Sequence, residues 1–249
     1  MTARRPATID VVILTWNDGP LLETAVASAL TSEDVDVRVW VIDNASEPPA
    51  AVRDDPRVVL VRNPENRGVA PGRNQGAKLG GAPFLAFLDS DAQLLPETLW
   101  NLLVPMLDDT SVGVTVPVFV GQEPTASAGR APSLWLKLQR ALNRRSDYEA
   151  LCPPGSGVWE VDFGIGACQL IRRVAFDQVG GLDEAIRFGP EDVDFCLRVK
   201  ERGWRVLQVA DARCVHPARR RFRGLLTRKG LRHGWTVARF YWRHRSRIR

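Results

Sequence analysis

Two aspartates one residue apart follow an apolar run that is typical of a buried strand. The run is FLAFL (84–88), and Asp89 and Asp91 flank Ser90 directly after it. Open α/β sheets bind ligands beyond the carboxyl ends of their strands. Carboxylate oxygens ligate Mg²⁺ or Mn²⁺ beside substrate phosphates. The spacing therefore indicates a divalent-metal site next to a diphosphate, although aspartates are also common in turns and as helix N-caps.

A second acidic group begins a predicted helix at about 191–202. Glu191, Asp192 and Asp194 fall within four residues of GPEDVD. The helix macrodipole favours acids in a first turn, which accounts for one or two of the three. A carboxylate here could accept a proton from a sugar hydroxyl. His216 follows a predicted strand; a lone histidine is more often structural, but a place near Asp91 would make it a metal ligand.

Polar residues also follow the other early strands, where they would line one edge of a sheet. They are Thr15, Asn17 and Asp18 after the first strand, Asp43 and Asn44 after the second, and Asn66 and Arg67 after the third. The loop NRGVAPGRNQG (66–76) precedes a helix and could accept a phosphate with help from Arg73. It matches neither G-x-G-x-x-G nor a Walker A loop, which disfavours dehydrogenases and P-loop enzymes.

Strands and helices alternate along the chain. Strands are predicted at 9–16, 37–43, 57–62, 84–89, 112–120 and about 205–210, with strand-like segments within 158–173, and helices at 20–30, 71–80 and 96–107. This alternation predicts an α/β fold with a mostly parallel central sheet. Pro117 predicts that its strand lies at an edge or carries a bulge. Residues 121–157 break the rhythm and are interpreted as a variable excursion over the active face.

Composition is that of a soluble globular protein. The 249 residues are 45% hydrophobic and 25% charged, and no apolar stretch approaches the roughly 20 residues that span a bilayer. The N-terminus lacks a signal-peptide cleavage pattern, so a cytoplasmic location is expected. The four cysteines, Cys152, Cys168, Cys196 and Cys214, form no C-x-x-C pair and are expected to be reduced packing residues.

Charge is divided unevenly along the chain. Residues 217–249 hold eleven arginines, Lys229 and no acid, so subtracting 12 from the net charge of +5 leaves −7 for residues 1–216. Leu231, Trp235, Ala238 and Trp242 share one helical face in this basic tail. The tail either packs this stripe on the body or docks on an anionic membrane surface.

Taken together, these motifs resemble the family 2 inverting glycosyltransferases, which have the GT-A nucleotide-sugar-binding fold. The resemblance rests on VVILTWN, VIDNAS, NRGVAPGRNQGAK, FLDSD, GIGACQLIRRVAFDQVGGLDE, GPEDVDFCLRVKERGW and the later histidine, in family order over residues 9–216. The later motifs look most like bacterial rhamnosyl- and galactofuranosyl-transferases of cell-surface polysaccharide assembly. We expect a GT-A domain at 1–216 and a basic amphipathic tail at 217–249.

The resemblance implies a role for each matching position. On the donor side, the base and ribose would contact Thr15, Asn17 and Asp43, and the base or diphosphate would lie near Arg73 and Asn74. Asp89 would touch the ribose or a metal-bound water, and Mn²⁺ or Mg²⁺ would be ligated by Asp91 and, in some members, His216. On the acceptor side, Asp192 would be the catalytic base, with Glu191 and Asp194 orienting the acceptor. Trp16 departs from the family's usual tyrosine or small polar residue.

The implied activity is that of an inverting glycosyltransferase of the hexosyltransferase type. The donor would be dTDP-rhamnose or a UDP-sugar, and the acceptor a hydroxyl of a glycan or a lipid-linked glycan. Two alternatives are a sugar-phosphate nucleotidyltransferase and a basic nucleic-acid-binding protein. The first would need a Gly-rich loop after strand one, where the chain reads TWNDGPLLE. The second would use the arginines and aromatic residues of the tail, but the acidic body repels nucleic acid.

Overall fold

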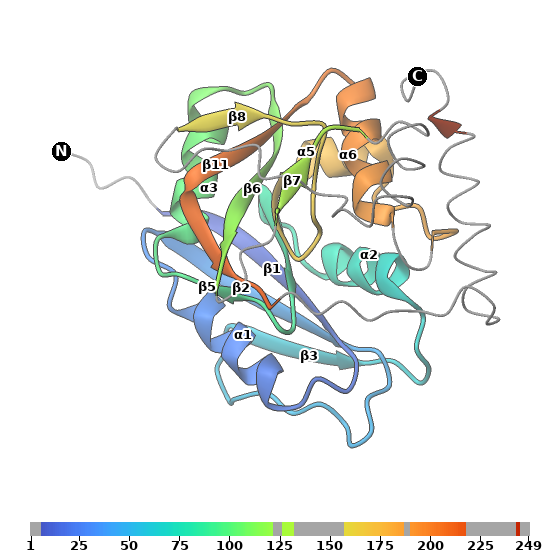
Figure 1. The fold of residues 1–249 in the computed structure, drawn as a ribbon. Helices are drawn as coiled ribbons and strands as arrows, with labels where there is room; N and C mark the ends of the chain where they lie inside the picture. The colour runs from blue at the N-terminus through green and yellow to red at the C-terminus, as the bar shows by residue number, and fades with distance from the viewer. Residues whose placement is uncertain (1–5, 122–125, 132–156, 187–189, 218–242, 245–249) are drawn as a thin grey trace.

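Four parallel strands form the first half of a central sheet, as the sequence predicts (Figure 1). They are β1 (Ala7–Thr15), β2 (Val35–Asp43), β3 (Val58–Arg62) and β4 (Phe84–Asp89), in the spatial order β3-β2-β1-β4. The computed structural model describes residues 6–121, 126–131, 157–186, 190–217 and 243–244. Because these strands are parallel, all four carboxyl ends lie at the same edge of the sheet.

The second half of the sheet brings later segments to that edge. β10 (Cys168–Arg172) lies antiparallel between β4 and β6 (Val112–Val120), and β11 (Arg205–Val215) runs parallel to β6. The short β5 (Gln93–Leu94) and β8 (Val158–Glu160) both pair antiparallel with β11. β7 (Ala128–Gly129) and β9 (Phe163–Gly164) form a separate two-stranded sheet. The end of β11 and the start of β10 therefore lie beside the end of β4.

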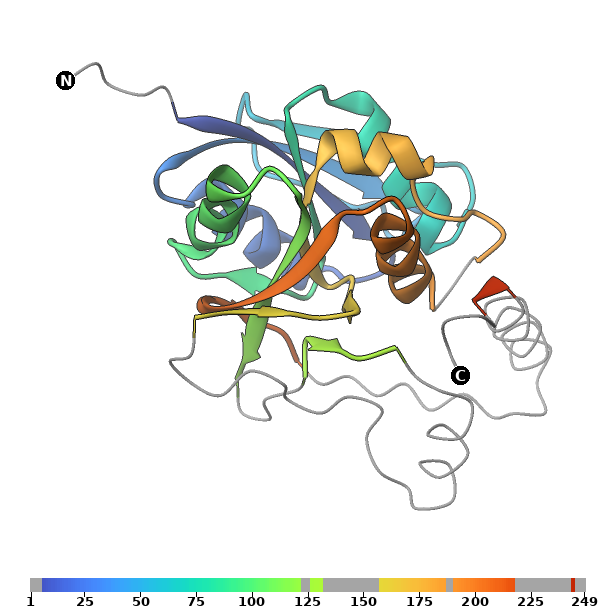
Figure 2. The same cartoon turned by 90° about the horizontal axis from the view of Figure 1, so that it is seen from above.

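Helices cover both faces of the sheet (Figure 2). α1 (Pro20–Leu30) and α3 (Thr98–Asp108) pack on one face, and α2 (Val69–Leu79), α5 (Arg173–Val179) and α6 (Glu191–Glu201) pack on the other. Successive residues of β1 point to opposite faces, so that Val11 and Ile13 join the first core and Val12 the second. Burial on both faces explains why these strands read as continuous apolar runs.

Small residues let α2 approach β1 closely. A Cβ atom on Gly72 would lie 2.4 Å from Cδ1 of Leu14, and one on Gly76 would lie 2.4 Å from Cγ1 of Val12. Neither glycine has a left-handed backbone, so their value here is space and not conformational freedom. Because α2 lies this close to β1, Arg73 on the same helix is buried next to the sheet.

The predicted strands and helices are confirmed, with small differences at their ends except for β11, which continues to Val215, five residues beyond the predicted end. β5, β7 and the seven-residue α5 were not predicted. The edge position offered for Pro117 is wrong, because β6 lies between β10 and β11. The alternative, a bulge, is what the structure has: the β6–β11 register shifts between Val209, opposite Pro117, and Arg213. This irregularity accommodates a residue that has no N–H to donate.

Three of the cysteines, Cys168, Cys196 and Cys214, are buried and free of disulfides, as predicted. Cys152, most of the 121–157 excursion, and most of the tail lie outside the described residues. The boundary between domain and tail at residue 216 stays a prediction. Within the described part of the chain, no helix has the length and apolar character needed to cross a membrane.

Candidate functional site

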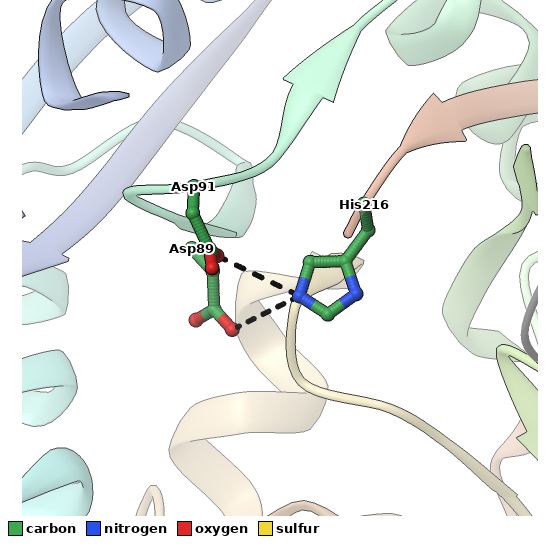
Figure 3. Close-up of side chains that lie close together, drawn as sticks. All are labelled: Asp89, Asp91 and His216. Carbon is green, nitrogen blue, oxygen red and sulfur yellow. Dashed lines mark ion pairs between the residues drawn. The ribbon is translucent and has the colours of Figure 1, made fainter. Parts of the chain in front are cut away.

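Three potential metal ligands meet at the carboxyl edge of the sheet (Figure 3). Nε2 of His216 lies 3.6 Å from Oδ1 of Asp91 and 4.0 Å from Oδ2 of Asp89. β5 explains how they meet, because Gln93, just after the DSD turn, pairs with Val215, just before His216. The ring of Phe119 packs against the imidazole with its centroid 5.1 Å away.

The chemistry of this group fits a divalent cation. One ligand atom from each of the three residues lies within 4.8 Å of the others. Oxygen atoms bound to one Mg²⁺ at about 2.1 Å lie roughly 3 Å apart, so a small inward movement would complete the geometry. Two carboxylates and one imidazole suit Mn²⁺ or Mg²⁺ better than a thiol-preferring metal. All three side chains are partly exposed, which leaves room for a further ligand.

The DSD turn is joined to the loop that follows β1. Oδ2 of Asp18 accepts hydrogen bonds from the hydroxyl of Ser90, from Oγ1 of Thr15 at 3.4 Å and from the amide N of Trp16 at 3.3 Å. Ser90 is buried although its two aspartate neighbours are not. Its hydroxyl therefore acts as the inner anchor of the turn, while Asp89 and Asp91 reach outward.

Asp43 organises the loop that follows β2. Its fully buried carboxylate accepts hydrogen bonds from the amide N atoms of Ser46 (2.8 Å) and Ala50 (3.1 Å) and from Nη1 of Arg62 (2.8 Å). Burial alone would raise the pKa of Asp43, but these hydrogen bonds and the Arg62 charge outweigh it and lower the pKa. The same loop binds Asn17, whose Oδ1 accepts from the amide of Glu47 at 2.7 Å.

A cavity of about 470 Å³ opens between these two loops and the start of α1. Its lining includes Thr15 and Asn17 from one loop and Ser46 from the other. Two of the three nucleoside-binding residues predicted from the sequence thus face one concave space, while Asp43 supports its wall from behind.

Arg73 is a buried cation between the two acidic groups of the site. Its Nη2 donates to Oδ1 of Asp89 at 2.5 Å and to the carbonyl of Gly166 at 2.7 Å, and Nη1 lies 3.8 Å from Oε1 of Glu191. Burial would lower the pKa of Arg73, but the charges of Asp89, Glu191 and Asp192 outweigh it and raise the pKa. The guanidinium therefore stays charged and joins β4 to the start of α6.

Asp192 is held on the opposite side of Gly166. Its Oδ2 accepts the amide N–H of Gly166 at 2.9 Å, and its Oδ1 accepts the amide N–H of Val193 at 2.8 Å. Burial raises the pKa of Asp192 despite these hydrogen bonds and the Arg73 charge. A carboxylate with a raised pKa is a stronger base, which suits proton abstraction near neutral pH.

Two predicted site residues are engaged in contacts within the chain. The amide of Asn74 donates to the carbonyl of Leu182 at 2.9 Å and to Oε1 of Glu184 at 3.0 Å, which fastens α2 to the loop after α5. Asp194 is fully buried among basic side chains. The structure thus brings Asp89, Asp91 and His216 together, and Arg73 together with Glu191 and Asp192, while the binding roles assigned to the site residues stay predictions.

Sequence reasoning missed Gly166, although it noted the Gly-rich centre of this segment. Gly166 contributes its N–H to Asp192 and its carbonyl to Arg73. The signal was the GIGA stretch itself, but its meaning depends on two partners that are distant in sequence. Ser90 and Asp18 were noted only as a spacer and a polar loop residue.

Comparison with known proteins identifies the region that carries most of this site. Residues 10–180 match the family model described as Glycosyl transferase family 2. The match contains Arg73, Asp89, Asp91 and Gly166 and ends before Asp192 and His216.

Two relatives from Mycobacterium tuberculosis extend the similarity. The chain is 32% identical over 216 residues to a pre-mycofactocin glycosyltransferase, covering 84% of this chain and 43% of that protein. It is 30% identical over 236 residues to an N-acetylglucosaminyl-diphospho-decaprenol L-rhamnosyltransferase, covering 84% of this chain and 75% of the relative. The chain therefore spans less than half the length of the first relative and three quarters of the second.

The fold is similar to that of a solved glycosyltransferase. A crystal structure of GalNAc-T7 with UDP, GalNAc and Mn²⁺ superimposes with a TM-score of 0.71 at 18% identity, covering 95% of this chain and 49% of that one. At this identity the likeness shows the fold alone, which is the GT-A fold expected from the sequence motifs.

Gly166→Ala tests the central packing of the site. The new Cβ would lie 2.4 Å from Nη1 of Arg73, and this guanidinium cannot swing aside without breaking its bonds to Asp89 and to Gly166 itself. We expect a loss of about 1–3 kcal/mol in the free energy of unfolding, as for other overpacked sites. Urea denaturation measures it.

Gly81→Ala is the matched control, because a Cβ there meets nothing within 4 Å and the backbone is not left-handed. Equal stability of the two variants would contradict the account of Gly166.

Proposed function

The chain belongs to glycosyl transferase family 2, and we propose that it moves a sugar from a nucleoside-diphosphate donor to an acceptor hydroxyl with inversion at the anomeric carbon. The observation that carries this proposal is the position of Arg73, which pairs with Asp89 of the Asp89–Asp91–His216 group on one side and interacts electrostatically with Asp192 on the other. One group suits a proton transfer, and the other suits the charge of a departing diphosphate. Family membership also disfavours a nucleotidyltransferase or a nucleic-acid-binding protein.

Donor binding is assigned to the half of the site built on the ends of β1, β2, β4 and β11. Thr15 and Asn17 would hold the nucleoside in their cavity, with Asp43 ordering the loop behind it. Asp91 and His216, with Asp89, would hold a divalent cation. That cation would neutralise charge on the leaving diphosphate. Arg73 supports this half by fixing the orientation of Asp89.

Transfer is proposed as a single displacement. Asp192 takes the proton from the acceptor hydroxyl while that oxygen attacks the anomeric carbon. The bond from this carbon to the diphosphate oxygen breaks, and its electron pair leaves with the diphosphate. Attack from the face opposite the leaving group inverts the configuration, and no sugar–enzyme bond forms. Glu191 would help to position the acceptor next to Asp192, whereas the buried contacts of Asp194 favour a different role for that residue.

Identity of donor and acceptor is proposed from the relatives. One relative is named as an L-rhamnosyltransferase of a decaprenol-linked sugar, and the structural neighbour was solved with UDP and Mn²⁺. We propose dTDP-rhamnose or a UDP-sugar as donor, a glycan or lipid-linked glycan as acceptor, and Mn²⁺ or Mg²⁺ as cofactor. A peripheral position on the inner face of the cell membrane would suit such an acceptor. Co-sedimentation with anionic and neutral vesicles would test whether residues 217–249 contribute to it.

Asp192→Asn tests the base. The amide keeps a similar shape but cannot take a proton, so we expect the turnover rate to fall by about 10²–10⁴-fold. Nucleoside-diphosphate affinity should stay within about twofold, because Asp192 does not belong to the donor half. Release of nucleoside diphosphate measures turnover, and titration calorimetry measures affinity. Asp177→Asn, an exposed acid on α5, is the control.

The pH profile gives a second readout of the same group. Asp192 must be ionised to act, and burial raises its pKa. Turnover should therefore fall on the acid side at a pH above the ordinary carboxyl pKa of 3.8. Wild-type turnover in the Asn variant would exclude Asp192 and make Glu191 the candidate base.

Asp91→Ala tests the metal group. Wild-type protein heated with UDP, dTDP or GDP should be stabilised more when Mn²⁺ is present. A nucleotide at 100 times its dissociation constant stabilises the folded protein by about 2.7 kcal/mol in total. Asp91→Ala should lose the metal-dependent part of this stabilisation together with turnover, and His216→Ala should weaken it. Full turnover of the wild type in excess chelator would overturn the metal assignment for both residues.

A further inference from the structure

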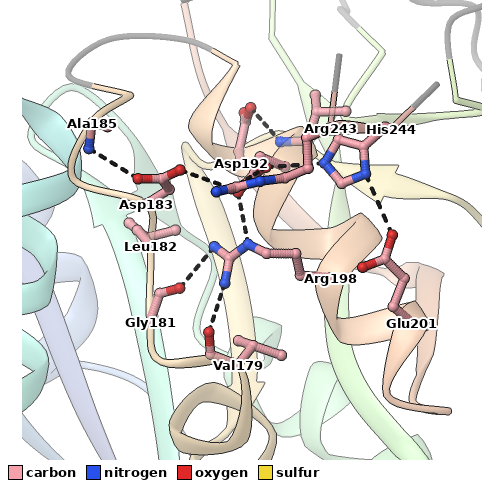
Figure 4. Close-up of polar contacts among 12 residues, drawn as sticks. Val179, Gly181, Leu182, Asp183, Ala185, Asp192, Arg198, Glu201, Arg243 and His244 are labelled. Carbon is pink, nitrogen blue, oxygen red and sulfur yellow. Dashed lines mark hydrogen bonds and ion pairs between the residues drawn. The ribbon is translucent and has the colours of Figure 1, made fainter. Parts of the chain in front are cut away.

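The fully buried carboxylate of Asp194, in the first turn of α6, binds three basic side chains. Figure 4 labels these three, Arg198, Arg243 and His244. Oδ2 of Asp194 accepts from Nε of Arg198 at 2.7 Å, and Oδ1 lies 3.0 Å from both Nη1 of Arg243 and Nε2 of His244. Arg198 belongs to the same helix, four residues on. Arg243 and His244 come from a segment about 50 residues later in the chain.

His244 lies along the helix with no exposed side-chain surface. Its Nε2 faces Asp194, and its Nδ1 lies 3.5 Å from Oε1 of Glu201, two turns further along α6. Residues seven apart lie on the same face of a helix. The imidazole therefore spans the first and last turns of α6 on a single face.

The other two cations extend the contact to the loop after α5. Nη1 of Arg243 also pairs with Oδ2 of Asp183 at 2.8 Å. Arg198 donates to the carbonyls of Val179 and Gly181, each at 2.8 Å. Asp194 is thus the centre of a network that joins α6, the 179–183 loop and the 243–244 segment.

Electrostatics make the buried carboxylate dependent on these partners. Burial alone would raise the pKa of Asp194, but the hydrogen bond with His244, the charge of Arg198 and the hydrogen bonds with Arg198 and Arg243 lower it to about 2. A buried charge that loses a partner is strongly destabilising, because its desolvation is no longer compensated. Without the 243–244 segment, Arg198 would be the one basic partner left to Asp194 among the described residues.

We propose that Arg243 and His244 are positioning residues for the helix that carries the catalytic base. Asp192 lies two residues before Asp194. Among its described side-chain hydrogen bonds, a single one comes from outside α6, and its donor is the N–H of Gly166 at 2.9 Å. Release of Asp194 would free the first turn of α6 to move relative to Gly166. The C-terminal segment then belongs to the catalytic unit, in addition to any membrane role of the tail. The consequence for turnover rests on the proposed function, whereas the consequence for α6 does not.

The test compares full-length variants by amide hydrogen exchange. His244→Leu replaces the imidazole by an apolar group of similar size, His244→Gln keeps an N–H donor, and Arg53→Leu removes one side of an exposed ion pair with Glu23 as the matched control. In His244→Leu we expect exchange of the α6 amides (191–201) to accelerate about tenfold to a hundredfold, as for a lost hydrogen bond to a charged group. Exchange of α1 (20–30) should not change.

The remaining variants and readouts separate positioning from general stability. His244→Gln should recover most of the α6 protection, and Arg53→Leu should retain all of it. Turnover of His244→Leu should fall at least about tenfold, which corresponds to about 1.4 kcal/mol in the activation free energy. The affinity for UDP or dTDP with Mn²⁺ should stay within about twofold, because α6 does not belong to the donor half of the site. If His244→Leu does not fold, Glu201→Gln removes the more exposed partner of the ring and should accelerate α6 exchange to a smaller extent.

Three outcomes would overturn the proposal. They are unchanged α6 exchange in His244→Leu and in Glu201→Gln, equal acceleration of α6 and α1, and no difference between the Leu and Gln replacements of His244. A wild-type protein that transfers no sugar would instead reject the proposed function, and the exchange data would still decide the role of His244.

Discussion

The site depends on one buried cation. Arg73 has almost no contact with solvent, and its charge is compensated by Asp89 on one side and by Glu191 and Asp192 on the other. A buried charge is tolerated only when it is paired and hydrogen-bonded, so the guanidinium constrains both partners as much as they stabilise it. The end of β4 and the first turn of α6 are therefore held at a fixed separation by a group that belongs to neither.

The rest of the architecture positions Arg73 and its acidic partners. Gly72 and Gly76 let α2 lie close to β1 and so bring Arg73 to the right depth. β10 runs against the direction of its neighbours, which places the Gly166 loop at the edge where the parallel strands end. β5 then pairs with the end of β11 and adds His216 to the two aspartates. The donor half rests on parallel strands, and the acceptor half rests on α6, whose buried Asp194 is compensated from the far end of the described chain.

The sequence predicted the elements better than their partners. Continuous apolar runs such as FLAFLD are long enough to identify a doubly covered strand, whereas the two residues of β5 carry no periodic signal. The acidic motifs marked Asp89, Asp91 and Asp192, because carboxylates at strand and helix ends are chemically conspicuous. Gly166 and His244 could not be found in this way. Their roles arise from contacts 26 and 50 residues away, and the sequence carries no local sign of such contacts. Pro117 shows the same limit, since a missing N–H predicts an irregularity but not whether its strand is an edge.

Coupling between the two acidic groups through Arg73 is the central claim, and a double-mutant cycle measures it most directly. Asp89→Asn and Glu191→Gln, singly and together, would be compared by urea unfolding in the wild-type chain and in an Arg73→Met background. We expect the two substitutions to be non-additive by about 0.5–3 kcal/mol in the wild-type chain, as for residues that share a charged partner, and additive once Arg73 is replaced. Additive effects in the wild-type chain would contradict coupling through Arg73 and would mean that the two halves of the site are energetically independent.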